Sequence, residues 1–206
     1  MLRLVEEQLS EGREPDRIGY FSFTKKATQE AIDRACAKFK LPRKELKWFR
    51  TLHSLAYQWL GCTYTDMIQK QDFKDFYREY GIDISKSIKT DDVPFGEEDS
   101  GLSLLDLYRV KNTSLEEEFR KHGHVKGGLQ RLQRIDKLYR LFKKQRGVKD
   151  YTDLITEFNK IDQSPRLDIV IVDEVQDLKP NEWQMVKIMM RQAQATYLAG
   201  DDDQAI

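Results

Sequence analysis

The sequence predicts an α/β fold in which an all-helical subdomain interrupts a parallel β-sheet domain. Residues 18–61 read as strand, helix, strand and helix in that order, and this alternation is typical of a parallel sheet. Residues 62–160 contain no convincing strand, and strands return only at residue 168. We therefore expect residues 1–61 and 161–206 to form the sheet domain and residues 62–160 to form the helical insertion.

The first part of the sheet domain is predicted from apolar runs and helical periodicity. Residues 2–10 read as the end of a helix, and residues 18–23 read as a buried strand. Residues 25–39 predict a helix because their apolar side chains recur on one face. Residues 48–51 are a candidate short strand, and residues 53–60 a candidate helix.

Helices dominate the predicted insertion. They are expected near residues 66–80, 102–111, 114–121, 128–145 and 151–160, with a polar, acidic loop at 85–101. The helix at 128–145 has the clearest apolar stripe, which we expect to be core. Its basic side chains, among them Arg131, Arg134 and Lys137, form a candidate surface for tracking phosphates. The alternative is an ordinary solvated helix surface.

The charge is balanced overall but segregated along the chain. Lys and Arg number 35, as do Asp and Glu. Residues 91–118 carry nine acids and two bases, whereas residues 121–149 carry ten bases and one acid. Such segregation can present a basic face to a polyanion.

Targeting features and cysteine usage predict a cytoplasmic protein. The two cysteines exclude a disulfide framework and suit a reducing compartment. No apolar run approaches the roughly 18 residues needed to span a bilayer. The N-terminus lacks the apolar segment of a signal peptide. We expect no association with a membrane.

Two predicted strands end in acids. The apolar run Ile169–Val172 leads directly into Asp173 and Glu174, and Thr196–Gly200 leads into three further acids and Gln204. Acids at the carboxyl ends of neighbouring parallel strands suggest one Mg²⁺–phosphate site. Asp173-Glu174 has the form of a Walker B element, in which the first acid holds Mg²⁺ and the second polarises the attacking water. The alternative is an acid pair that caps the next helix.

Five segments together resemble the UvrD/Rep/PcrA-like superfamily 1 DNA helicases, and they occur in the order found in that family. They are Phe21–Ala27 (similar to motif Ia), Thr51–Ala56 (motif Ib), Asp150–Ile155 (the acidic-aromatic segment upstream of motif II), Asp173–Asp177 (motif II) and Ala199–Ile206 (motif III). The resemblance implies a RecA-like domain 1A interrupted by the helical domain 1B. It implies an ATP-dependent DNA helicase with ATP and Mg²⁺ as cofactors.

The resemblance also implies roles at the nucleotide site. Asp173 would coordinate Mg²⁺, and Glu174 would act as the catalytic base. Gln204 would sense the γ-phosphate and couple nucleotide state to DNA, and Asp201 would lie with them at the nucleotide.

For single-stranded DNA, the resemblance implies a path along motifs Ia and Ib. The residues expected on it are Phe23, Thr24, Lys25, Thr51, His53 and Ser54. Hydroxyls and imidazole can bond phosphate oxygens, and an aromatic ring can stack on a base. Lys25 stands where the family usually has Asn, and Leu52 where it usually has Phe. Phe23 could instead be the last core residue of its strand, and His53 could make a hydrogen bond at a helix start.

One motif of that family does not occur in these 206 residues, which contain no Gly-x-x-x-x-Gly-Lys-[Ser/Thr] P-loop. We therefore expect the 206 residues alone not to hydrolyse ATP at a useful rate. They are expected to act with a P-loop segment and a second RecA-like domain, on single-stranded DNA and a duplex junction. DNA binding by this chain should be weak and sensitive to salt.

Two other classes of function remain open from the sequence. One is a module without ATPase activity that binds DNA or a helicase. The other is a metal-dependent nuclease that uses Asp173, Glu174 and Asp201–Asp203; the positions of Gln176 and Gln204 favour nucleotide sensing over it.

Overall fold

The computed structural model describes residues 2–84, 103–122 and 127–201. The chain divides into two compact units. The first, here called the sheet unit, comprises Met1–Leu60 and Glu157–Ile206; the second, the helical unit, comprises Gly61–Thr156. The expected acidic loop at 85–101 lies outside the described residues.

The described sheet contains four strands, and every pair of neighbours is parallel. The strands are β1 (Ile18–Phe21), β2 (Phe49–Arg50), β3 (Ile169–Val172) and β4 (Ala195–Leu198), in the spatial order β2-β1-β3-β4. Phe21 is in register with Val172, and Val172 with Leu198. The carboxyl ends of the strands are therefore aligned, and the residues that follow them meet at one edge of the sheet. The α/β fold class with a parallel sheet is confirmed.

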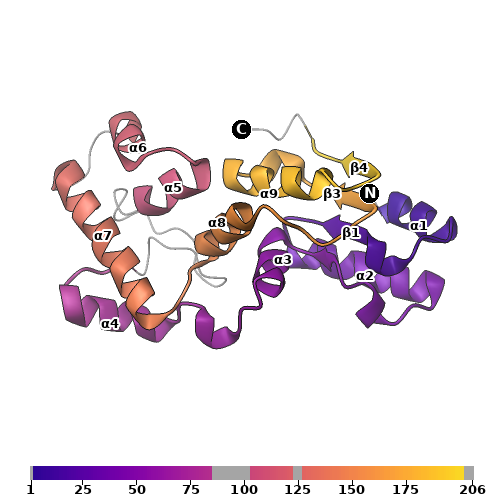
Figure 1. Cartoon of the computed structure of the whole chain (residues 1–206), viewed down its shortest axis with the longest axis horizontal. Coiled ribbons are helices and arrows are strands. Elements are labelled where there is room, and N and C mark those ends of the chain that lie inside the picture. The colour runs from indigo at the N-terminus through magenta and orange to yellow at the C-terminus, as the bar shows by residue number, and fades with distance from the viewer. Residues whose placement is uncertain (1, 85–102, 123–126, 202–206) are drawn as a thin grey trace. The chain divides into compact units, whose positions relative to one another are not determined.

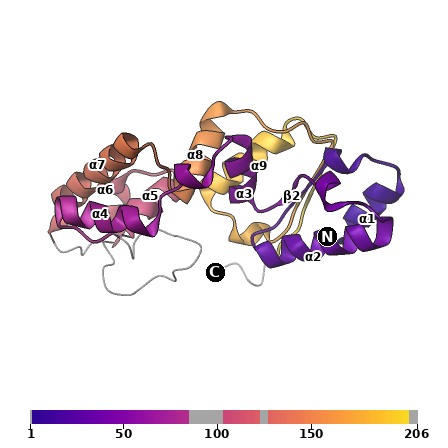
Figure 2. The ribbon, with the colours of Figure 1, turned by 90° about the horizontal axis from the view of Figure 1, so that it is seen from below.

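Helices cover the sheet on both faces. In the sheet unit they are α1 (Leu2–Ser10), α2 (Lys25–Phe39), α3 (Leu52–Trp59) and α9 (Pro180–Met190), and the boundary between the units falls inside α8 (Tyr151–Ile161). Buried residues of α1 and α2 pack on the face that includes Ile18, Tyr20 and Ile171. The connections β1-α2-β2 and β3-α9-β4 run in opposite directions along the sheet. Right-handed crossovers then place α2 and α9 on opposite faces, as Figures 1 and 2 show.

This topology creates a switch point between β1 and β3. In open α/β sheets, ligands bind outside the carboxyl ends of the strands at the place where the direction of winding reverses. The loops after Phe21 and Val172 lie on either side of this place. The fold therefore marks the end of β3, with its acid pair, as the first position at which to look for a site.

The helical unit has its own hydrophobic core. Its described helices are α4 (Lys70–Tyr80), α5 (Leu104–Lys111), α6 (Leu115–His122), α7 (Gly128–Arg146) and the first part of α8. Most of the apolar stripe of α7 lies in this core as expected, whereas Leu141 is exposed. Phe142 packs edge-on against Phe76 of α4 with ring centroids 5.2 Å apart. In the described part of this unit, the β-type pairing is a single bridge between Met67 and Lys149.

Several element boundaries differ from the sequence prediction. Strand β1 ends at Phe21 rather than at residue 23, because Thr24 already caps α2. Strand β2 is confined to Phe49–Arg50. Helix α4 begins at Lys70 rather than near residue 66, since a separate 3-10 turn occupies Tyr64–Asp66.

None of the helices in the described ranges is long and apolar enough to cross a membrane.

Candidate functional site

Asp173 lies directly after β3 at the switch point and is held by contacts to β1. Its backbone N–H donates to the carbonyl oxygen of Phe21 over 2.8 Å. The hydroxyl of Tyr20 donates to Asp173 Oδ2 over 2.9 Å. The Tyr20 side chain belongs to the buried core. Burial, together with the bond to the carboxylate, raises the pKa of Tyr20 well above its usual value, so that it remains a donor. The direction of the Asp173 carboxylate is thus fixed from within the core.

Glu174 is exposed and occupies an unusual backbone conformation. Its φ of 58° lies in the left-handed region, which a residue with a Cβ adopts at a cost. Its Oε2 accepts a hydrogen bond from Nε2 of Gln176 over 2.7 Å. The tight reversal after β3 therefore presents this carboxylate on the surface at the edge of the sheet.

The acid pair does not serve as a helix cap. Helix α9 is capped by its own Glu182, whose Oε2 accepts from the backbone N–H of Lys179 over 2.9 Å. Glu174 precedes the 3-10 turn Val175–Asp177, but its side chain makes no capping bond there. The alternative interpretation of these acids as a helix cap is therefore wrong.

The segment after β4 lies beside this turn. The backbone N–H of Val175 donates to the carbonyl oxygen of Ala199 over 2.9 Å. The backbone N–H of Asp201 donates to Oε1 of Gln176 over 3.2 Å. The two strand ends that carry acids are thus brought together, as expected from the sequence. Gln204, together with Asp202 and Asp203, lies outside the described residues.

The side chains at this edge of the sheet carry the kind of ligand atom, carboxylate oxygen, that a magnesium ion prefers. Mg²⁺ prefers oxygen ligands and is usually held by one or two carboxylates together with phosphate oxygens. Asp173 offers a carboxylate whose second oxygen is directed by Tyr20, and Glu174 follows it at the surface. Tyr20 was not among the candidates from the sequence, since an aromatic residue in an apolar run reads simply as core.

The residues of the motif Ia segment follow β1 at the same edge. Phe23 is 47% exposed, so it is not the buried end of its strand. Oγ1 of Thr24 accepts from the backbone N–H of Ala27 over 3.1 Å and caps α2. Lys25 opens that helix and is exposed. A ring and a helix start are therefore presented next to the acid pair.

The motif Ib segment follows β2 and is built in a similar way. Thr51 caps α3 by accepting from the backbone N–H of Ser54 over 3.3 Å. The hydroxyl of Ser54 accepts from Arg50 over 3.2 Å. Nδ1 of His53 lies 3.8 Å from Oε1 of the buried Glu182, so its neighbour is a carboxylate of α9. Arg50, which the sequence analysis did not select, belongs to the same group.

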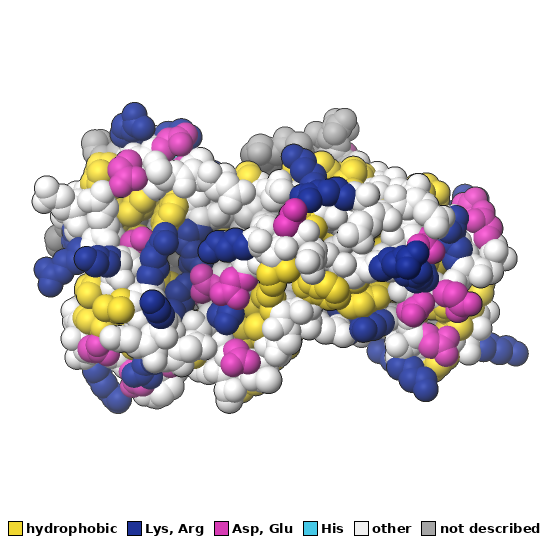
Figure 3. All heavy atoms as spheres, viewed as in Figure 1, with side chains coloured by type: hydrophobic (Ala, Val, Ile, Leu, Met, Phe, Trp, Pro, Cys, Tyr) yellow, Lys and Arg dark blue, Asp and Glu magenta, His cyan; other side chains and the backbone are white. Residues whose placement is uncertain are grey.

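On α7, the basic side chains belong to two classes. Arg134 and Lys137 are exposed, as a surface for a polyanion requires, and Arg131 is partly buried. Figure 3 shows Lys and Arg side chains gathered on the part of the surface that carries α7, with Asp and Glu beside them. Lys143, on the same helix, is instead buried. The bases of α7 thus differ in exposure, and Lys143 is not part of the exposed surface.

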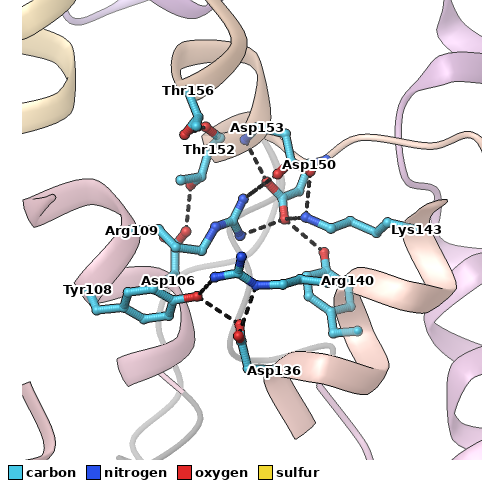
Figure 4. Close-up of polar contacts among 11 residues, drawn as sticks. Asp106, Tyr108, Arg109, Asp136, Arg140, Lys143, Asp150, Thr152, Asp153 and Thr156 are labelled. Carbon is cyan, nitrogen blue, oxygen red and sulfur yellow. Dashed lines mark hydrogen bonds and ion pairs between the residues drawn. The ribbon is translucent and has the colours of Figure 1, made fainter. Parts of the chain in front are cut away.

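A buried ion cluster explains the acidic-aromatic segment at the start of α8 (Figure 4). The guanidinium of Arg109 donates to both oxygens of Asp150, over 2.8 Å each. Lys143 donates to Asp150 over 2.6 Å, and Tyr139 over 3.0 Å. Asp153 also pairs with Arg109. The backbone N–H of Asp150 donates to the carboxylate of Asp153, and the backbone N–H of Asp153 donates to the carboxylate of Asp150. Burial alone would raise the pKa of Asp150, but Arg109 and Lys143 hold that pKa well below its usual range. The cluster joins α5, α7 and α8 and is structural.

Comparison with known proteins agrees with the order of motifs and with the fold. No curated protein sequence matches the chain significantly. The family model of the UvrD/REP helicase N-terminal domain, however, matches residues 1–206. This match over the full length of the given sequence shows that the chain belongs to the UvrD/REP helicase N-terminal domain family.

Proposed function

We propose that the chain supplies the 1A and 1B portions of an ATP-dependent DNA helicase that translocates on single-stranded DNA and unwinds duplex. The sheet unit would be the RecA-like domain 1A, and the helical unit would be domain 1B. The observation that carries the proposal is the carboxylate of Asp173, held by Tyr20 at the switch point of a parallel sheet. Family membership gives the same class of activity.

At the nucleotide, the proposal assigns one task to each side chain. Asp173 would hold Mg²⁺, which when bound neutralises charge on the β- and γ-phosphates of ATP. Glu174 would accept a proton from the attacking water, which its exposed position permits. Asp201 would lie beside the nucleotide, and Gln204 would sense the γ-phosphate.

DNA would run along the loops after β1 and β2. Phe23 would stack on a base, since its ring is exposed. Thr24, Lys25, Thr51, His53 and Ser54 would contact the backbone of the strand. Arg131, Arg134 and Lys137 of α7 would contact phosphates near the duplex junction.

We further propose that the 206 residues do not hydrolyse ATP by themselves. Without P-loop amides and their lysine, the phosphates lack the cradle that P-loop enzymes use. A P-loop segment and a second RecA-like domain would complete the enzyme.

The test is ATP hydrolysis by the product of the complete reading frame, with and without single-stranded DNA, beside its Glu174→Gln variant. Loss of a general base lowers kcat by about 10²- to 10⁴-fold. The matched control is Asp168→Asn, which removes a carboxylate at the opposite end of the same strand. We expect DNA-stimulated turnover in the wild type and the control, and its loss in Glu174→Gln.

The same experiment separates the alternatives. No turnover in the intact product would overturn the helicase proposal and favour a module that binds DNA or a helicase without ATPase activity. Mg²⁺-dependent DNA cleavage without ATP would favour the nuclease.

A further inference from the structure

Gln176 connects the two acidic strand ends through a single amide. It lies in the 3-10 turn Val175–Asp177 between β3 and α9. Its Nε2 donates to Oε2 of Glu174 over 2.7 Å, while its Oε1 accepts from the backbone N–H of Asp201 over 3.2 Å. A neutral amide carries a donor and an acceptor at its tip. A carboxylate or an apolar side chain of similar size cannot make both bonds.

The surrounding backbone is arranged around this amide. Val175 donates to Ala199, and Ala199 in turn donates to Val172 over 2.9 Å, so the turn and the end of β4 are hydrogen-bonded to each other. Gly200 lies against the amide: a Cβ at that position would lie 2.7 Å from Oε1 of Gln176 and 2.8 Å from Cγ2 of Val175. A side chain at position 200 would therefore displace the amide from between its two partners.

We propose that Gln176 is a positioning residue that orients the Glu174 carboxylate. Because the same amide binds the segment after β4, this orientation depends on where that segment lies. This role rests on the proposed function, because it matters for catalysis only if Glu174 is the base. Glu174 is exposed and makes its hydrogen bond to this amide, so a change at Ala199–Asp201 is transmitted to the carboxylate through Gln176. The amide thereby ties the proposed base to the loop that begins motif III.

The test is a double-mutant cycle in the product of the complete reading frame. Gln176→Leu should lower kcat on the order of tenfold, with little change in KM for ATP, as for other residues that orient a reacting group. In a Glu174→Gln background the same substitution should have no further effect, since there is no base left to position. Gly200→Ala should reproduce the loss of kcat. Gln184→Leu, on α9 and outside this arrangement, is the matched control.

A second measurement follows the bridge without relying on activity. Amide hydrogen exchange at Asp201 should accelerate in Gln176→Leu and stay unchanged in Gln184→Leu. Equal losses of kcat in both backgrounds would mean a merely structural role and would overturn the proposal, as would unchanged exchange at Asp201. If the wild type has no ATPase activity, the proposed function fails and the positioning role fails with it, whereas exchange still reports whether the amide bridge exists.

Discussion

The hydroxyl of Tyr20 shows how a single core residue can serve the chemistry at the edge of a sheet. Its ring packs among buried residues that α1 and α2 cover, while its oxygen donates to Asp173. The buried hydroxyl holds the Asp173 carboxylate in one orientation, which would favour binding of Mg²⁺ at the proposed site. Removing such a partner typically costs about 10- to 100-fold in metal affinity or activity.

Tyr20→Phe is therefore expected to keep the fold and to weaken the site. The ring and its packing remain, and the loss of one hydrogen bond costs about 1 kcal/mol of stability. In the product of the complete reading frame, the Mg²⁺ concentration for half-maximal ATPase activity should rise by about tenfold or more. Tyr197→Phe, on β4 of the same sheet, is the control. An unchanged Mg²⁺ dependence would contradict the assignment.

Among the elements, α8 depends on charges supplied by two other helices. Asp150 is buried, and its partners Arg109 and Lys143 come from α5 and α7. Because breaking a buried ion pair leaves its partners unpaired, Asp150→Asn should lower the free energy of unfolding by about 3–5 kcal/mol. The control is Glu117→Gln, which breaks an exposed pair with Lys121 and should cost less than about 1 kcal/mol. Urea titration of both variants decides between these values.

The same cluster predicts how stability depends on pH. The pKa of Asp150 is depressed in the folded state, so its contribution is complete above the unfolded pKa of about 3.9. It is lost as the pH falls from there through the lower folded pKa. The difference in unfolding free energy between wild type and Asp150→Asn should thus be constant from about pH 5 to 7 and shrink below about pH 4. A difference that grows on acidification would contradict the ion cluster.

The sequence predicts elements well where periodicity decides them, and less well where a distant partner decides. Strand β3 and helix α2 match their predicted ranges because buried runs and apolar faces extend along them. Lys143 is one of the ten bases between residues 121 and 149, yet it is buried and pairs with Asp150, which follows the helix. No local pattern could have marked it.

Some residues of the candidate site carry a signal in the sequence, and others do not. The acid pair is readable because carboxylates after an apolar strand are unusual. The sequence analysis did not select Tyr20, and it connected Gln176 with nucleotide sensing but not with Glu174, since both contacts depend on which atoms lie opposite these side chains. An amide or a phenol carries no charge pattern along the chain.

For the whole molecule, the segregated charge predicts binding to nucleic acid that weakens with salt. Affinity for single-stranded DNA should fall steeply between about 50 and 200 mM salt, because phosphate contacts release counterions. Replacing Arg134 and Lys137 together with Gln should reduce the logarithmic salt slope by about 0.7 for each lost contact. Lys44→Gln is the control, since Lys44 precedes β2 and so lies at the edge of the sheet opposite to the loops after β1 and β2. Fluorescence anisotropy measures the slopes; a flat response in the wild type would rule out the basic surface on α7.

The left-handed backbone at Glu174 carries a consequence for how such a chain would change under mutation. Glycine or asparagine adopts that conformation with less strain than glutamate. Either replacement would relieve the strain and stabilise the turn, but it would remove the proposed base. Stability and the proposed chemistry therefore make opposite demands on position 174, as is usual where a strained backbone carries a functional side chain.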